Sequence, residues 1–261
     1  MRLVAITHVP TRALERGERT YVDRSPIDFP LAQRQHEEYR ALLAACGAEV
    51  TVLDASRDCP DAVFVEDTAV VLDEIAVIAS PGAVSRRGET AAVAAELRKH
   101  REVREIRLPA TLDGGDVVIA GRTLFVGASA RTNVSGAEAL ATFAKPFGYR
   151  VVRVPIRDCL HLKSACCALP DGRLLINPSW VDASALPGFT HVHIPPDEPF
   201  GADFAIAGET VIVSTTNPST AQLIASLGFT VRATPLSEFE KAEGGVSCLS
   251  IIFRLMDGAT T

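Results

Sequence analysis

The amino-acid sequence predicts an α/β protein built as a ring of five similar units. Pairs of short apolar runs around a turn recur along the chain, and segments with helical periodicity lie between them. The copies start at positions 68, 116, 165, 203 and 248, in steps of 48, 49, 38 and 45 residues. Repeats of this period are typical of supersecondary units that stack on their neighbours. An open α/β sheet is the commoner layout for alternating helices and strands, but the repeat favours the ring.

Each copy begins with a predicted β-hairpin. The two apolar runs flank a turn that contains glycine or aspartate, the residues that tight hairpin turns prefer. The four hairpins cover residues 68–79, 116–127, 165–177 and 203–214. A half-copy follows Cys248, and we expect its partner strand at residues 3–8, at the other end of the chain.

Helical patterns follow three of these hairpins and the first strand. They cover residues 31–46, 91–100, 135–147 and 219–227, and Gly47 stands where a helix C-cap glycine is expected. Strands are predicted after short turns at residues 49–53, 149–154 and 229–232. Each unit should therefore read strand, strand, helix, strand. Because long linkers and low-complexity tracts are missing from the sequence, we expect one domain over residues 1–261.

Composition excludes several classes of function. The 261 residues are 47% hydrophobic with a net charge of -6 and no basic run, which argues for a globular core and against a nucleic-acid partner. The apolar run at residues 1–8 is too short for a signal peptide or a membrane span, so we expect a cytoplasmic protein without a membrane partner. The six cysteines lack a CxxC pair and the density of a disulfide scaffold. No GxGxxG or GxxxxGK[ST] motif supplies a phosphate cradle.

Polar residues gather at the start of each copy, and in a ring they would converge on one central cavity. Charged side chains are rarely buried unless they are paired, so acids placed beside apolar strands need a cationic partner. That partner is either an arginine of this chain or a substrate guanidinium, whose planar donors two carboxylates can bind. The polar residues at the starts of the copies are Asp61, Glu66, Asp67, Asp113, Asp116, His161, Lys163 and Cys248.

Cys248 is the candidate nucleophile. It follows the pair Gly244-Gly245, which leaves room for close approach of a substrate or another backbone segment. An inert buried thiol is the alternative, because free cysteine is among the most buried residue types. His191 and His193 could supply half of a metal site, but a strand with two outward histidines is the commoner explanation and we expect no metal.

Six short motifs carry a family resemblance. They read FVED at 64–67, LDGGD at 112–116, ARTN at 130–133, LHLKS at 160–164, NP at 177–178 and GVSC at 245–248. Their order resembles that of the dimethylarginine dimethylaminohydrolase family, in the pentein or guanidine-modifying superfamily, from Thr7 to about Leu255. The resemblance implies a five-bladed α/β propeller that hydrolyses Nω-methylated arginine to citrulline and a methylamine.

The resemblance also implies roles for individual residues. Cys248 would be the nucleophile, His161 the general acid and base, and Asp113 the carboxylate that orients the imidazole. This chemistry requires no metal or organic cofactor. The substrate contacts would be Asp61, Glu66, Asp67, Arg86, Arg131 and Leu14. Glu66 and Asp67 would hold the guanidinium. Arg86 and Arg131 would bind the α-carboxylate of the substrate, with Arg87 as an alternative to Arg86.

Two features bear on the substrate and on access to it. Arginine and agmatine deiminases resemble one another in a His-x-Asp motif, and here the third position is Lys163. Losing that acid makes room for N-methyl groups and favours methylated arginine. The polar segment 11–19, which contains Leu14, is either a lid or an ordinary surface connection.

Two other functions stay open from the sequence. One is a related arginine deiminase or amidinotransferase that uses the same thiol. The other is a non-catalytic propeller that binds basic ligands and would not need Cys248. The non-catalytic propeller would take basic ligands or partner proteins at its acidic cavity, whereas for an enzyme we expect a small guanidino molecule as the partner. A homodimer stays open as the oligomeric state.

Overall fold

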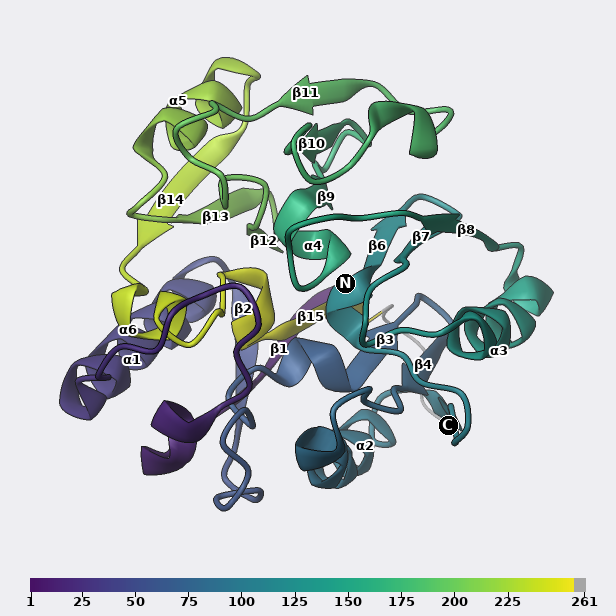
Figure 1. Ribbon diagram of the computed structural model, residues 1–261, viewed down its shortest axis with the longest axis horizontal. Coiled ribbons are helices and arrows are strands. Elements are labelled where there is room, and N and C mark those ends of the chain that lie inside the picture. The colour runs from purple at the N-terminus through teal and green to yellow at the C-terminus, as the bar shows by residue number, and fades with distance from the viewer. Residues whose placement is uncertain (256–261) are drawn as a thin grey trace.

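The computed structural model describes residues 1–255, which form five three-stranded sheets around a common centre (Figure 1). Every sheet has the same pattern, an antiparallel pair followed by a third strand that pairs in parallel. A parallel pair needs a crossover connection, and helices supply it in four of the five units. The predicted ring of α/β units is confirmed.

The first three units follow the chain in order. Unit 1 consists of β3 (Ala69–Val71), β4 (Ile75–Ile78), α2 (Thr90–Leu97) and β5 (Glu102–Glu105). Unit 2 consists of β6 (Val117–Ala120), β7 (Thr123–Gly127), α3 (Val134–Ala144) and β8 (Arg150–Val154). Unit 3 consists of β9 (Cys166–Ala168), β10 (Leu174–Ile176) and β11 (His191–His193).

Unit 5 closes the ring with strands from the two ends of the chain. Unit 4, which comes before unit 5 around the ring, consists of β12 (Ala205–Ala207), β13 (Thr210–Ser214), α5 (Pro218–Ser226) and β14 (Thr230–Thr234). Unit 5 consists of β15 (Ile251–Leu255), β1 (Arg2–His8), α1 (Phe29–Ala45) and β2 (Ala48–Leu53). β15 pairs antiparallel with β1, with Val4 opposite Phe253, as the half-copy after Cys248 predicted.

Unit 3 departs from the predicted strand, strand, helix, strand order. Only the 3-10 turn η6 (Ala183–Ala185) lies between β10 and β11. The connecting segment contains Pro178 and Pro187, and proline removes a helical hydrogen bond and clashes with the preceding turn. The prediction of a helix in every unit is therefore wrong for this one, which is also the shortest repeat.

Short helical turns precede four of the hairpins or strands and bring their polar residues together. They are η2 (Val65–Thr68), η4 (Gly114–Asp116), α4 (Leu162–Ala165) and η7 (Ser247–Leu249). η2 packs against both η4 and η7, and α4 packs against η4. Turns from units 1, 2, 3 and 5 therefore meet at the centre of the ring, where they position the site.

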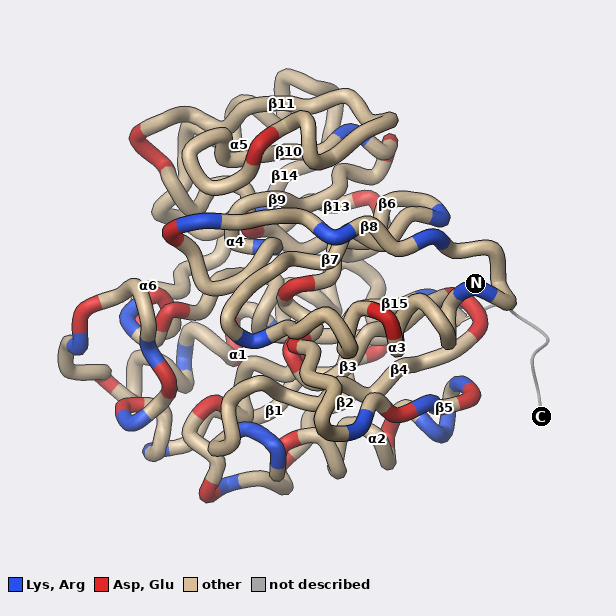
Figure 2. The backbone as a smooth tube through the Cα atoms, turned by 45° about the vertical axis from the view of Figure 1, so that its right-hand side comes forward, with Lys and Arg blue, Asp and Glu red and all other residues tan. Residues whose placement is uncertain are grey.

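The longer helices α1, α2, α3 and α5 lie on the outside of the ring, as Figure 1 shows. Tyr39 and Leu43 of α1 are fully buried against Phe239 of α6 (Ser237–Glu240). The 3-10 turns η1 (Arg12–Arg16), η3 (Val84–Glu89) and η5 (Lys145–Phe147) complete the elements of residues 1–255. No helix in that part of the chain is both long and apolar enough to cross a membrane. Basic and acidic residues are interspersed along the backbone (Figure 2).

Candidate active site

One cavity at the centre of the ring is lined by residues from distant parts of the chain. Most of the residues expected at the site are in its wall. The cavity is small, with a volume of about 20 Å³, and Glu18 from the segment after η1 forms part of its wall. The expected residues that line it are Asp61, Asp67, Arg86, Arg131, His161 and Cys248. The sulfur and the imidazole, 87 positions apart in the sequence, thus share one cavity.

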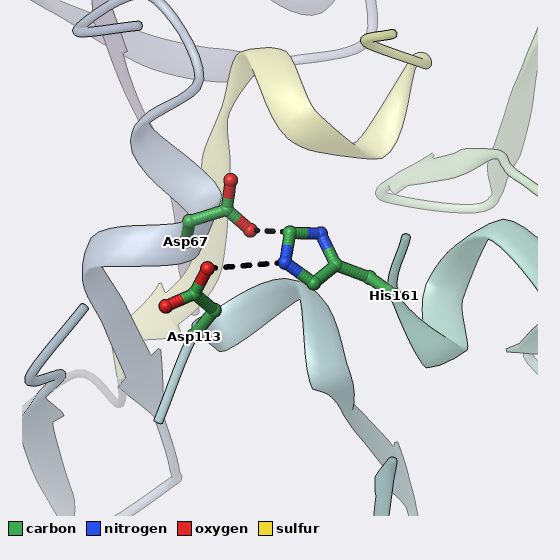
Figure 3. A group of neighbouring side chains, drawn as sticks. All are labelled: Asp67, Asp113 and His161. Carbon is green, nitrogen blue, oxygen red and sulfur yellow. Dashed lines mark hydrogen bonds and ion pairs between the residues drawn. The ribbon is translucent and has the colours of Figure 1, made fainter. Parts of the chain in front are cut away.

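His161 lies between two carboxylates that approach its ring from different turns (Figure 3). Its Nε2 is 3.1 Å from Oδ2 of Asp113, and its Nδ1 is 3.5 Å from Oδ1 of Asp67. Gly115 lies directly beside this group, where a Cβ atom would overlap both the Asp67 carboxylate and the imidazole. The Gly-Gly pair of the second motif therefore lets the acidic turn reach the histidine.

The two carboxylates determine the charge of the imidazole. Burial by itself lowers the pKa of His161, but the charge of Asp67 and the hydrogen bond with Asp113 outweigh burial and raise the pKa to about 9. At neutral pH the ring is therefore an imidazolium, which can donate a proton. Burial by itself raises the pKa of Asp67, but the positive charges of His161 and Arg86 outweigh burial and lower this pKa below its ordinary value.

Cys248 lies in η7 and is partly exposed to the cavity. The two preceding glycines allow close packing, because a Cβ on Gly244 would overlap the ring of Phe64 and one on Gly245 would overlap the carboxylate of Asp203. Burial raises the pKa of the Cys248 thiol well above its ordinary value, and nearby carboxylates, first Asp203, raise it further. The thiol is thus protonated unless a cation enters the cavity.

Arg86 is engaged within the protein. Its Nη1 donates to Asp67, while Nε and Nη2 donate to Oε2 of Glu89 at 3.0 and 2.8 Å. Nη2 also donates to the backbone oxygens of Asp61 and Phe64. Asp67 therefore has a cationic partner in its own chain, which is the alternative that the sequence left open.

Glu66 also has an internal partner and does not line the cavity of Cys248. Lys163 donates to its Oε1, and the Ser247 hydroxyl donates to its Oε2 at 2.7 Å. Together with Lys163 and Ser247 it lines a second cavity, with a volume of about 230 Å³. The structure thus places the lysine of the LHLKS motif against a carboxylate that was expected to bind the substrate.

Arg131 differs from Arg86 because its guanidinium makes no hydrogen bond or ion pair with another residue of the described chain, 1–255. Only its backbone N–H is engaged, by Oγ of Ser129 at 3.0 Å. The side chain is thus free to bind an anionic group in the cavity.

The segment 11–22 contributes Glu18 to the cavity wall and is tied to that wall by hydrogen bonds. The backbone N–H of Glu18 donates to Oδ2 of Asp61 at 3.1 Å, and those of Thr20 and Tyr21 donate to the carboxylate of Glu243 at 2.6 and 2.9 Å. Leu14 in η1 does not reach the cavity but is fully buried in the core beneath α1. Its contact with the substrate stays a prediction.

Comparison with known proteins assigns the family. The family of eukaryotic N,N dimethylarginine dimethylhydrolases matches residues 26–165 of this chain. A dimethylarginine dimethylaminohydrolase of Streptomyces coelicolor is 41% identical over 252 residues, which is 96% of each protein. The chain belongs to the dimethylarginine dimethylaminohydrolase family. The enzyme of the same name from Pseudomonas aeruginosa is 33% identical over 250 residues, 95% of this chain and 98% of that one.

Solved structures of dimethylarginine dimethylaminohydrolases have the same fold. A cysteine-to-serine variant of the Pseudomonas aeruginosa enzyme, complexed with citrulline, superposes with a TM-score of 0.92 at 32% identity. A histidine-to-glycine variant of a dimethylarginine dimethylaminohydrolase, as an adduct with S-methyl-L-thiocitrulline, has a TM-score of 0.91, also at 32% identity. Each covers 97% of this chain and 100% of its own. The five-bladed α/β propeller that the resemblance implied is thus confirmed.

In this member of the dimethylarginine dimethylaminohydrolase family, two buried acids had no role assigned from the sequence. Asp116 accepts hydrogen bonds from Thr132 Oγ1 at 2.6 Å and from the backbone N–H of Leu162 at 3.1 Å, so it fixes the residue after His161. Asp203 accepts the backbone N–H of Ser247 at 2.9 Å, immediately before Cys248. Both acids stand at the start of a hairpin copy, which is the signal that could have identified them.

Asp67, Asp113 and His161 are the one group of three metal-binding side-chain types in residues 1–255 whose ligand atoms lie within 4.8 Å of one another. The imidazole is already hydrogen-bonded to one of these carboxylates and paired with the other. The contacts satisfy the group without an ion, and the same geometry serves to orient and charge an imidazole.

Proposed function

We propose that the protein hydrolyses Nω-methylated arginine, both asymmetric dimethylarginine and monomethylarginine, to citrulline and a methylated amine, with Cys248 as the nucleophile. The observation that carries the proposal is the shared cavity. In a member of this family, it brings together a thiol, an imidazolium held by Asp113, and the carboxylates of Asp61 and Asp67. A single catalytic domain over residues 1–261 accounts for all of these groups.

The substrate cation activates the nucleophile. The pKa of Cys248 is high because the thiol is buried among carboxylates, and a guanidinium bound against Asp67 offsets that negative charge. The thiol then loses its proton to solvent at neutral pH, and the thiolate adds to the guanidino carbon. Deprotonation is thereby coupled to binding, because the cation is required for the thiol to ionise.

His161 performs both proton transfers. As an imidazolium it protonates the departing amine as the tetrahedral intermediate collapses, which leaves a thiouronium on Cys248. The neutral imidazole then takes a proton from the water that hydrolyses this intermediate, and citrulline is released. Asp113 fixes the ring for both steps through the bond to Nε2.

Binding at the other end of the substrate falls to Arg131, because its guanidinium is unpaired within the described chain. Arg86 contributes to the α-carboxylate site only after it exchanges its bond with Asp67, which the incoming guanidinium also needs. Glu66 then acts indirectly, through Ser247 and the turn of Cys248.

Product analysis tests the proposal. The protein is incubated with asymmetric dimethylarginine, monomethylarginine, arginine and agmatine, and the ureido product is measured, which is citrulline from the three arginines and N-carbamoylputrescine from agmatine. We expect citrulline from the two methylated substrates and none after Cys248→Ser, which should still bind citrulline. Citrulline formed chiefly from arginine would overturn the substrate and keep the mechanism, whereas turnover by Cys248→Ser would overturn the mechanism.

A further inference from the structure

A third cavity, larger than the catalytic one, lies beside it and is called the side pocket. It has a volume of about 330 Å³ and lies between unit 4, α6 and the glycine pair that precedes Cys248. Ser164, Glu243 and Gly244 line both cavities, so the two share a wall. Its size is that of pockets that hold small organic molecules.

The wall of this side pocket has a one-sided charge. Five carboxylates line it and no lysine or arginine does; they are Asp197, Glu198, Asp203, Glu240 and Glu243. None of the five forms an ion pair with any residue of the described chain. Two of them, Glu198 and Asp203, are buried, and buried charges in proteins are normally paired with an opposite charge, so these two lack a cationic partner.

The hydrogen bonds of these acids come from neutral donors. Two backbone N–H groups at the start of α5 donate to Glu198, both at 2.7 Å. The hydroxyls of Ser214 and Thr216 donate to Oε1 of Glu240 at 2.6 and 2.8 Å. Such donors hold the carboxylates in place and leave their charge without a counter-ion.

Two further observations indicate the kind of ligand. Asn217 is only 6% exposed, and its side chain neither caps α5 nor bonds to another residue of the described chain, so its amide has no protein partner in the pocket wall. Phe200, packed edge-on against Trp180, and Val246 add apolar surface. Aromatic and acidic groups together suit methylated ammonium ions.

Asp203 connects the side pocket to the reaction. Its carboxylate lines the pocket, accepts the N–H of Ser247 and fills the space beside Gly245. Burial raises the pKa of Asp203 to about 7, so a cation in the pocket would favour its ionised form. A ligand there would therefore contact Asp203, which holds the turn that carries Cys248.

We infer that the side pocket binds the small alkylammonium ion that the reaction releases, and this inference rests on the proposed function. Hydrolysis breaks the bond between the guanidino carbon and the methylated nitrogen. Water supplies the oxygen of citrulline and its protons, and the positive charge of the guanidinium leaves on dimethylammonium or methylammonium. The pocket offers that cation a place next to the cavity, separate from citrulline.

Equilibrium binding of dimethylammonium chloride tests the inference without turnover. The methyl groups of Val22 and Val246 line only the side pocket and those of Leu160 only the catalytic cavity, so methyl NMR separates the two locations. We expect saturable shifts at Val22 and Val246, unchanged when citrulline is present, and no such shifts with the neutral alcohol propan-2-ol. Shifts confined to Leu160, competition with citrulline, or no saturable binding would overturn the inference.

Two variants and a matched control complete the test. Glu240→Gln keeps a hydrogen-bond acceptor but removes one charge, and Asn217→Leu replaces the unpartnered amide. Each should weaken dimethylammonium binding about fivefold or more, whereas Glu209→Gln, in the exposed β12–β13 turn, should not change it. Equal binding in all three variants would refute the site. Failure to form citrulline would instead refute the proposed function, because the binding experiment does not depend on it.

Discussion

His36 should make the protein sensitive to acid. This residue of α1 is fully buried, and neither ring nitrogen has a hydrogen-bond partner in residues 1–255. Its ring packs against Phe239 with the centroids 6.1 Å apart. Burial, with smaller contributions from the charges of Arg40 and His8, lowers the pKa of His36 from 6.5 to about 3. The folded protein thus holds this imidazole neutral over a range in which the unfolded chain protonates it.

The size of the effect follows from the shift. As the pH falls below 6.5, the unfolded chain takes up a proton that the folded protein excludes until the pH approaches 3. The free energy of unfolding therefore decreases through this window, by about 1.4 kcal/mol for each pH unit. Between pH 7 and pH 5 this one residue costs about 2 kcal/mol. Stability that depends on it is fully present above pH 6.5 and is lost as the pH falls.

Urea unfolding at pH 7 and pH 5 measures this loss in the wild type and in His36→Leu. The wild type should lose about 2 kcal/mol more than the variant between the two pH values, because all other groups titrate alike in both proteins. His193→Gln, at an exposed position of β11, is the control and should behave as wild type. An equal loss in wild type and His36→Leu would refute the reasoning.

Three further predictions concern the site. An NMR titration should find the pKa of His161 near 9, and Asp113→Asn should lower it; a value below 7 in the wild type would contradict the geometry. Gly115→Ala should reduce kcat about 100-fold, because its Cβ would overlap Asp67 and the imidazole; circular dichroism checks that the variant folds, and full activity would contradict the packing. Glu243→Gln should speed alkylation of the active-site thiol by iodoacetamide several-fold, because it weakens the hydrogen bonds that tie the segment 11–22 to the cavity wall. An unchanged rate would show that this segment does not limit access to the thiol.

The fold could be predicted from the sequence because its information is local and repeated. Hairpin turns and apolar runs recur with a nearly constant period. The apolar run after Cys248 has no second run beside it in the sequence, and it pairs with β1. The exception is unit 3, where the period shortens to 38 residues and prolines occupy the crossover. A repeat predicts the unit as a whole and does not predict which copy has lost an element.

The site could be located but its pairings could not. Position at the start of a copy was enough to place Asp67, Asp113, His161 and Cys248 near the centre, because equivalent positions in a ring face the same axis. Which cation a given acid pairs with depends on side-chain reach in three dimensions.

The structure shows two contacts of this kind. Lys163 reaches Glu66 across 97 positions, and Arg86 reaches both Asp67 and Glu89. Leu14, which was assigned to the site by resemblance alone, packs into the core with residues of α1. None of these contacts follows from spacing along the chain.

The closure of the ring by β1 and β15 has a consequence for how the thiol is placed. The acids and the imidazole of the site lie on segments that precede Cys248 in the chain, and Cys248 lies in η7, directly before the strand that pairs with β1. A chain cut before residue 248 therefore contains the acids and the imidazole but not the proposed nucleophile. The turn of the thiol is held on its far side by the pairing of β1 with β15, so its placement depends on contact between the two most distant strands of the described chain.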